Sequence, residues 1–221
     1  HLGTWGNAGG KSETMSGLMT QAHRRSATDG HVAAIPPALM IVVQNVMSTA
    51  WRVLLEDVRQ GDFSICDTTE DQITERLQTI LGELDAAGDS AVLGLTEFQT
   101  PVREGNVSNY DGTHVDKQPD LAFRPIRGRI PCRNTVPVAI FIECKPIDAR
   151  HPLPSTYCCD GLMRFVNGDY AWGVDRAMMV GYVRNVCTLP GGLSTALDAP
   201  RLSAQMELIG RLEELPNTIS G

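Results

Sequence analysis

Two acidic residues and one basic residue lie on predicted strands, where the burial of charge needs a chemical reason. Asp120 opens one strand, directly after Pro119, and Glu143 and Lys145 close another, after the apolar run 138–142. Because side chains alternate along a strand, Glu143 and Lys145 point to the same face of the sheet. Charged groups there are costly to desolvate unless they are paired or bound to a metal. The pattern predicts either a plain Glu–Lys pair at a strand end already in solvent or a site that does chemistry.

The residues before this group predict two helices. Apolar residues recur at intervals of three and four after Pro36-Pro37, and Gly61 ends that stretch. A second helix is expected over residues 69–87, with a threonine N-cap at 68 or 69 and acidic residues in its first turn. Gly88 follows its end, as glycine often does at a helix C-terminus.

Four strands and two more helices complete the predicted fold. The strands are expected at 91–102, 119–126, 136–146 and 177–183, and the helices at 155–166 and 201–215. The first two strands are joined by a polar loop over 104–117. This order is typical of an α/β fold in which helices flank a central mixed sheet. Residues 1–30 are polar and without period, so we expect a flexible tail there and a single domain over 31–221.

The composition indicates a globular protein outside the membrane and secretory classes. The chain has 221 residues, of which 42% are hydrophobic and 20% charged. Its longest apolar run, 32–43, is interrupted by two prolines and is too short to span a bilayer. No basic start followed by an apolar stretch and a cleavage site is visible, and the six cysteines form no CxxC pair. We therefore expect a cytoplasmic protein with free thiols and no membrane contact.

The charges are unevenly distributed along the chain. The net charge of −7 argues against a protein that coats nucleic acid non-specifically. Residues 54–120 hold 15 acidic against 4 basic residues, whereas residues 124–164 hold 7 basic against 3 acidic ones. The basic segment could hold a polyanion beside a metal cluster, and an ordinary patchy surface would explain it equally well.

The charged group on the strands resembles the motif of the PD-(D/E)XK nuclease superfamily. Pro119-Asp120 is followed by 22 residues and then by Glu143-x-Lys145. The family core runs helix–strand–strand–strand–helix–strand, with the motif on its second and third strands, and the likeness covers about residues 66–185. The resemblance implies a restriction-endonuclease-like fold with about four core strands. It also implies a metal-dependent nuclease, more an endonuclease than an exonuclease, acting on DNA more readily than on RNA.

The same resemblance implies roles for the motif residues. Asp120 and Glu143 would bind Mg²⁺ or Mn²⁺, with the backbone carbonyl of Cys144 as a further ligand. Lys145 would orient or help to deprotonate the attacking water and offset the charge of the phosphate. The products would carry 5′-phosphates.

Further site residues are expected around this motif. Family members often add an acid from the first core helix, and the predicted apolar stripe lies within about 40° of Glu70, whereas Glu75 points about 140° away. A first-turn glutamate with its carboxylate in water would fit the sequence equally well. Contacts to nucleic acid are expected from Tyr157 and Arg164 in the following helix, and from Arg124 in the basic segment.

Other interpretations of the sequence stay open. Glu97 and His114 are weaker candidates for metal ligands, and Cys158-Cys159 near His151 lacks an orienting partner for a thiol hydrolase. A binding module that keeps the fold without cleaving, a chance motif on an unrelated α/β fold, and a homodimer also remain open. The nuclease interpretation requires the Asp120 and Glu143 carboxylates to converge on adjacent strands.

Overall fold

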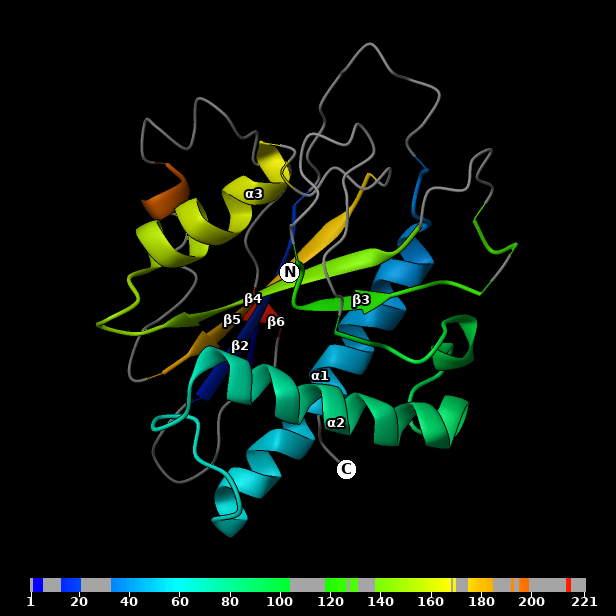
Figure 1. Ribbon diagram of the computed structural model, residues 1–221, viewed down its shortest axis with the longest axis horizontal. Coiled ribbons are helices and arrows are strands. Elements are labelled where there is room, and N and C mark those ends of the chain that lie inside the picture. Colours follow the sequence, from blue (N-terminus) through cyan, green and yellow to red (C-terminus); the bar gives the residue numbers. More distant parts are fainter. Residues whose placement is uncertain are drawn as a thin grey trace.

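The computed structural model describes a mixed α/β fold (Figure 1). It covers residues 2–5, 13–20, 33–103, 118–126, 128–130, 138–167, 169, 175–184, 192, 195–198 and 214–215. For 2–5, 13–20 and 214–215 the description is limited to the backbone. Within these residues helices cover both faces of a mixed sheet, which confirms the expected fold class at this level.

Helix α1, Pro37–Gln60, confirms the first predicted helix. Proline at its first position is compatible with helix geometry, because that residue's N–H would have no helical partner. Gly61 ends the helix with a φ of 82°, and its N–H bonds back to the carbonyl groups of Asp57 and Val58. The cap therefore follows the rule that a left-handed terminal residue favours glycine.

Among the helices of the described ranges, α1 has the length and apolar composition that could cross a membrane. The core helix of a globular protein meets the same criterion. Eight side chains of α1 are buried, and they are Leu39, Met40, Val43, Val46, Met47, Ala50, Trp51 and Leu54. They pack in the same core cluster as α2 and the sheet, so here α1 serves as a core helix.

Helix α2, Glu70–Ala87, confirms the second predicted helix and its capping residues. The Thr69 side chain accepts a hydrogen bond from Gln72 N–H, and the Gln72 side chain accepts one from Thr69 N–H. This capping box fixes the first turn, which carries Glu70 and Asp71. Figure 1 shows α2 crossing α1, and both helices pack against one face of the sheet.

The sheet has the order β3-β4-β5-β2-β1-β6. In that order the strands are Leu121–Phe123, Ile140–Ile147, Ala177–Val183, Glu13–Thr20, Leu2–Trp5 and Glu214–Leu215. Strand β3 pairs antiparallel with β4, and β4 pairs parallel with β5. These three strands correspond to three of the four expected strands, and β5 has the predicted bounds.

The connection from β4 to β5 covers the other face of the sheet. It consists of the π-helix η3, Leu153–Leu162, continued by α3, Met163–Val166, which together confirm the predicted helix. The two glycines Gly161 and Gly181 let η3 lie close to the strands. A Cβ atom at Gly161 would lie 2.5 Å from Met179 Cε and 3.2 Å from Lys145 Cγ.

Alternation along β4 decides which side chains meet which helices. Ile140, Ile142 and Cys144 belong to the core cluster shared with α1 and α2. The intervening residues point to the face covered by η3 and α3, where Ile147 packs in a second cluster. Glu143 therefore shares the η3 face with Lys145, as the sequence predicted.

The predicted strand at 91–102 is wrong. The chain instead forms two short 3₁₀ turns, η1 at Gly88–Ser90 and η2 at Leu95–Glu97, followed by isolated bridges to residues 122 and 125. The Asp89 carboxylate accepts hydrogen bonds from Gly94 N–H and from the N–H and hydroxyl of Thr96. Such local bonding competes with a strand ladder and holds the segment in a turn.

The predictions for the chain ends also need correction. Two segments of the expected tail, 2–5 and 13–20, are strands β1 and β2, because β2 pairs with the backbone of β5 along its whole length. Backbone pairing of this kind leaves little trace in hydrophobic periodicity. Of the expected helix at 201–215, residues 214–215 form β6 and pair with β1, and residues 201–213 lie outside the described residues, as does the polar loop 104–117.

Candidate active site

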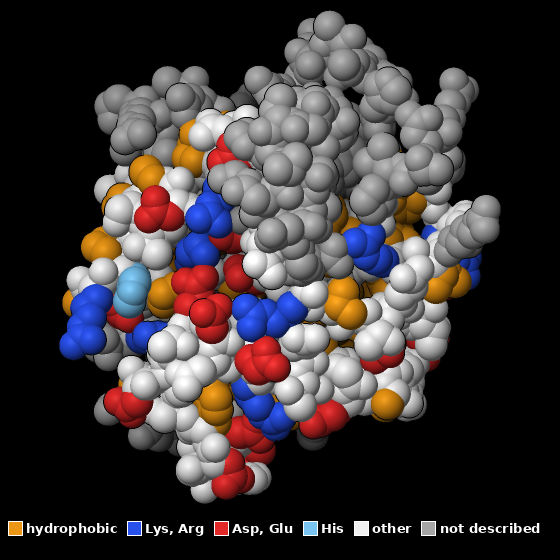
Figure 2. All heavy atoms as spheres, in the orientation of Figure 1, with side chains coloured by type: hydrophobic (Ala, Val, Ile, Leu, Met, Phe, Trp, Pro, Cys, Tyr) orange, Lys and Arg blue, Asp and Glu red, His pale blue; other side chains and the backbone are white. Residues whose placement is uncertain are grey.

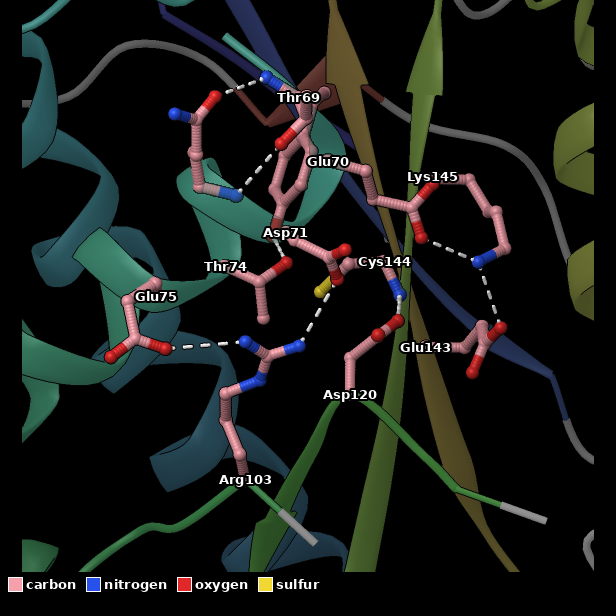
Figure 3. A network of polar contacts seen from close by, with 12 residues as sticks. Thr69, Glu70, Asp71, Thr74, Glu75, Arg103, Asp120, Glu143, Cys144 and Lys145 are labelled. Atoms are coloured by element: carbon pink, nitrogen blue, oxygen red, sulfur yellow. Dashed lines mark hydrogen bonds and ion pairs between the residues drawn. The ribbon is translucent and has the colours of Figure 1, made fainter. Parts of the chain in front are cut away.

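The end of the β3–β4 ladder brings Asp120 beside Glu143. The antiparallel register pairs Leu121 with Ile142, so one further step along both strands places Asp120 opposite Glu143. The Asp120 Oδ2 atom accepts a hydrogen bond of 2.7 Å from the backbone N–H of Cys144 (Figure 3). The Asp120 side chain thus supplies a hydrogen-bond acceptor for a backbone amide of β4 that lies beyond the last residue pair of the β3–β4 ladder.

Glu143 is the most deeply buried acid of this site. Its side chain is 1% exposed. The Oε1 atom lies 2.9 Å from Lys145 Nζ and 2.9 Å from Nη1 of Arg164, on α3. A buried carboxylate is tolerated when hydrogen-bonded cations compensate its charge, and here a strand and a helix each supply one.

Lys145 joins the strand to the first turn of α2. Its Nζ atom lies 2.7 Å from Glu70 Oε1, in addition to its contact with Glu143 (Figure 3). The Lys145 side chain is 10% exposed and that of Glu70 is 31% exposed. Both carboxylates therefore hold the ammonium group. On the face of the molecule drawn in Figure 2, acidic side chains gather near the middle, between basic ones.

Burial and charge shift the pKa values of two site residues. Burial raises the pKa of Asp120 to about 7, and the neighbouring Glu143 carboxylate adds to the rise while the Lys145 ammonium opposes it. Burial alone would lower the pKa of Lys145, yet the surrounding carboxylates raise it above the ordinary lysine value. Lys145 is therefore a permanent cation, whereas Asp120 titrates near neutral pH in the absence of a further positive charge.

The carboxylates offer oxygen ligands of the kind that Mg²⁺ and Mn²⁺ prefer. Within the described part of the chain, no three His, Cys, Asp or Glu side chains gather as a group that could hold a metal ion. Asp120 and Glu143 are the pair of carboxylates that the motif implies as ligands, and Glu143, like Glu70, also contacts the Lys145 ammonium. Two carboxylates suit a Mg²⁺ ion that keeps several of its waters, so the donor chemistry fits the cation that the motif implies.

The thiol of Cys144 points away from this group into the core. It is fully buried in the core cluster that also contains Tyr182, and burial raises its pKa. A protonated thiol on the other face of the sheet is not a ligand for the same metal. The expected role of the Cys144 backbone carbonyl stays a prediction.

The three residues expected to contact nucleic acid lie in different settings. Arg164 reaches the site through Glu143, and its side chain is 38% exposed. Arg124 follows β3 at the end opposite Asp120. The prediction for Tyr157 is wrong, because its side chain is fully buried under η3, 3.4 Å from the position of a Cβ atom on Gly181.

The weaker candidates are separated from the site or take other partners. Glu97 forms an ion pair with Arg129, and His114 lies outside the described residues. His151 Nδ1 lies 2.9 Å from Asp148 Oδ1. Burial, with a smaller contribution from Cys159, raises the pKa of the Cys158 thiol to about 12, which leaves little thiolate for nucleophilic chemistry.

The sequence did not predict the contacts that fix helix α2 beside the site. The hydroxyl groups of Thr74 and Tyr182 lie 3.0 Å apart, and both side chains are fully buried. Arg103 lies 3.2 Å from both Asp71 and Glu75, and so ties the segment that replaces the first predicted strand to α2 (Figure 3). One feature of the sequence could have indicated the role of Thr74. It lies four residues after Glu70, so both residues share one face of the helix.

Comparisons of the chain with protein-family models, with curated proteins and with solved structures find no match.

Proposed function

We propose that this protein is a metal-dependent nuclease with a restriction-endonuclease-like core. One observation carries the proposal: Asp120, directly before β3, lies beside the Glu143 end of the antiparallel β3–β4 pair, and Lys145 lies on the same face of β4 as Glu143. The nuclease interpretation requires these carboxylates to converge, and the neighbouring positions of the two residues support it. The order of helix α2, strands β3 and β4, helix η3–α3 and strand β5 is also that of the family core without its first strand.

In the proposed mechanism Asp120 and Glu143 bind Mg²⁺ or Mn²⁺ through their carboxylate oxygens. When bound, the cation polarises the phosphate and lowers the pKa of a water molecule. Lys145 contributes a fixed positive charge beside Glu143, where it orients the attacking water and offsets charge that develops on the phosphate. Arg164, which contacts the same Glu143 oxygen from α3, adds a second positive charge at the rim.

The proposed substrate is nucleic acid, with DNA favoured over RNA. Since the net charge is −7, binding has to come from a local group of cations instead of from the whole surface. Arg164 and Lys145 provide that group in the described residues, and both belong to the basic segment 124–164.

One observation favours a second candidate, a binding module that keeps the fold without cleaving. The Lys145 ammonium is already held by Glu70 and by Glu143. A site balanced in this way would tolerate the absence of a metal. The two candidates differ in whether the protein turns over a phosphodiester.

A cleavage assay separates the two candidates. Supercoiled and linear DNA, single-stranded DNA and RNA are each incubated with Mg²⁺, Mn²⁺ or EDTA. We expect metal-dependent cutting by the wild type that Asp120→Asn and Lys145→Met abolish, with folding verified by circular dichroism. Glu83→Gln removes an acid whose side chain is 61% exposed on α2 and serves as the control. Binding of any of these substrates without cutting would favour the second candidate.

A further inference from the structure

The site contains one acidic residue whose partner differs from the one that the family motif implies. Glu70 directs its Oε1 atom at the Lys145 ammonium, at 2.7 Å. Asp120 directly precedes β3 and Glu143 belongs to β4, whereas Glu70 comes from the first turn of α2 (Figure 3). The contact between Glu70 and Lys145 joins residues 75 positions apart in the sequence, so the placement of α2 decides whether it forms.

The first turn of α2 is held in place by its capping box. Both hydrogen bonds between Thr69 and Gln72 are present, which fixes the backbone on either side of Glu70. The direction of the Glu70 side chain then depends on how the helix is rotated about its axis.

A buried hydrogen bond sets that rotation. Thr74 lies one turn after Glu70 on the same face of α2, and its hydroxyl lies 3.0 Å from the hydroxyl of Tyr182 on β5. Neither side chain is exposed, so a rotation of α2 would leave two buried hydroxyl groups without this bond. The cost of an unpaired buried polar group gives the helix one preferred setting.

The Tyr182 side chain is itself fixed from two further directions. Its ring stacks on Trp51 of α1 with centroids 5.7 Å apart and planes 1° from parallel. Its side chain also packs in the core cluster that contains Cys144, the residue between Glu143 and Lys145 on β4. The Tyr182 side chain therefore links α2 to the core face of the strand that carries the two charged site residues.

We propose that Glu70 is the positioning residue for Lys145, and that the buried Thr74–Tyr182 hydrogen bond sets the helix that presents it. Glu70 then holds the Lys145 ammonium group from α2, as Glu143 does from β4. The inference rests on the proposed function only for the role of Lys145 in the reaction. The placement of the Lys145 side chain by Glu70 can be tested separately.

The test measures the rate at which an acylating reagent modifies Lys145 in the full chain in the presence of EDTA. The protein is then digested, and mass spectrometry of its peptides gives the extent of modification at each lysine. The sequence has only two other lysines, Lys11 and Lys117, which serve as internal references for the amount of reagent. We expect Glu70→Gln to raise the rate at Lys145 severalfold without changing the other two. Thr74→Val and Tyr182→Phe should raise it as well, and Thr74→Ser, which keeps the hydroxyl, should restore the wild-type rate.

A matched control separates positioning from a loss of stability. Ile80→Val makes a small cavity in the buried face of the same helix and leaves the Thr74–Tyr182 bond in place. An unchanged Lys145 rate in Glu70→Gln would overturn the proposal, and so would a rise in Ile80→Val equal to that in Tyr182→Phe. Because the assay needs neither a metal nor turnover, a protein that cuts no nucleic acid still gives a decisive answer about the placement.

Discussion

At the scale of single residues, the charges of the site are compensated unequally. Glu143 meets two cations within 2.9 Å, whereas Asp120 accepts its hydrogen bond from the neutral Cys144 amide. This difference explains why burial and a neighbouring carboxylate raise the pKa of Asp120 to about 7. In the proposed mechanism a divalent cation supplies the missing positive charge.

The raised pKa of Asp120 predicts a pH dependence of stability. The folded state holds the proton until about pH 7, whereas the unfolded chain releases it near 3.8, so ionisation of Asp120 lowers the free energy of unfolding between these values. Asp120→Asn should therefore match the wild type near pH 4 and be more stable above pH 7, by about 2–4 kcal/mol. Urea unfolding in EDTA between pH 4 and 8 measures this, and a constant difference across the range would refute it.

The two cations around Glu143 predict the effect of removing its charge. Glu143→Gln leaves the buried side chain of Lys145 without one carboxylate partner, and should cost about 1–3 kcal/mol in free energy of unfolding. Glu75→Gln makes the same change in the exposed pair with Arg103, where about 0–1 kcal/mol is expected. Equal losses in the two variants would contradict the compensation described for Glu143.

The sequence indicated which residues form the candidate site, but it did not indicate which side chains contact them. Strand alternation put Glu143 and Lys145 on one face of the sheet, and the resemblance to the nuclease motif added Asp120 to them. Neither indicated that Glu70 would pair with Lys145, because that contact depends on the rotation of α2 set by a residue of β5. Tyr157 was misplaced because the sequence did not show how closely η3 lies over Gly181.

At the scale of elements, local signals predicted helices well and one strand badly. The caps of α1 and α2 are short-range interactions, and the expected bounds were confirmed at Gly61 and Thr69. The segment 91–102 has strand-like composition, but the bonds of the Asp89 carboxylate fold it into turns. Side-chain-to-backbone competition of this kind is not visible in hydrophobic periodicity.

The capping box gives a prediction at this scale. Thr69→Ala removes the hydroxyl that accepts from Gln72 N–H, and should lower the free energy of unfolding by about 1 kcal/mol. Thr69→Ser keeps an acceptor at the same place and should lose much less. Urea unfolding of the three proteins checks this, and similar losses in both variants would show that the cap contributes little.

At the scale of the whole molecule, the sheet explains why the site lies where it does. Strand β3 is short, so β4 extends beyond it, and the extension carries Glu143 and Lys145. Helix α2 packs on one face of β4 and η3 on the other, which brings Glu70 and Arg164 to the same end of the strand. The backbone pairing of β2 with β5, which the sequence did not reveal, completes the sheet on the other side.

Metal binding should stabilise the whole fold. A ligand that binds only the folded state adds about 2.7 kcal/mol when its concentration is 100 times its dissociation constant. Saturating Mn²⁺ should therefore raise the melting temperature of the wild type, and raise it little or not at all in Asp120→Asn. Thermal unfolding with Mn²⁺ and with EDTA checks this, using Glu83→Gln as a control that should respond as the wild type does.

In the proposed reaction Asp120, Glu143 and Lys145 cut phosphodiester bonds with the help of a divalent cation. The most direct measurement is the rate of nicking of supercoiled DNA by the wild type, Asp120→Asn, Lys145→Met and Glu83→Gln, each purified in the same way and assayed with Mn²⁺ and with EDTA. We predict nicking by the wild type and by Glu83→Gln in Mn²⁺ alone, and none by the two site variants. Nicking that persists in folded Asp120→Asn, or that is absent from the folded wild type, would contradict the claim.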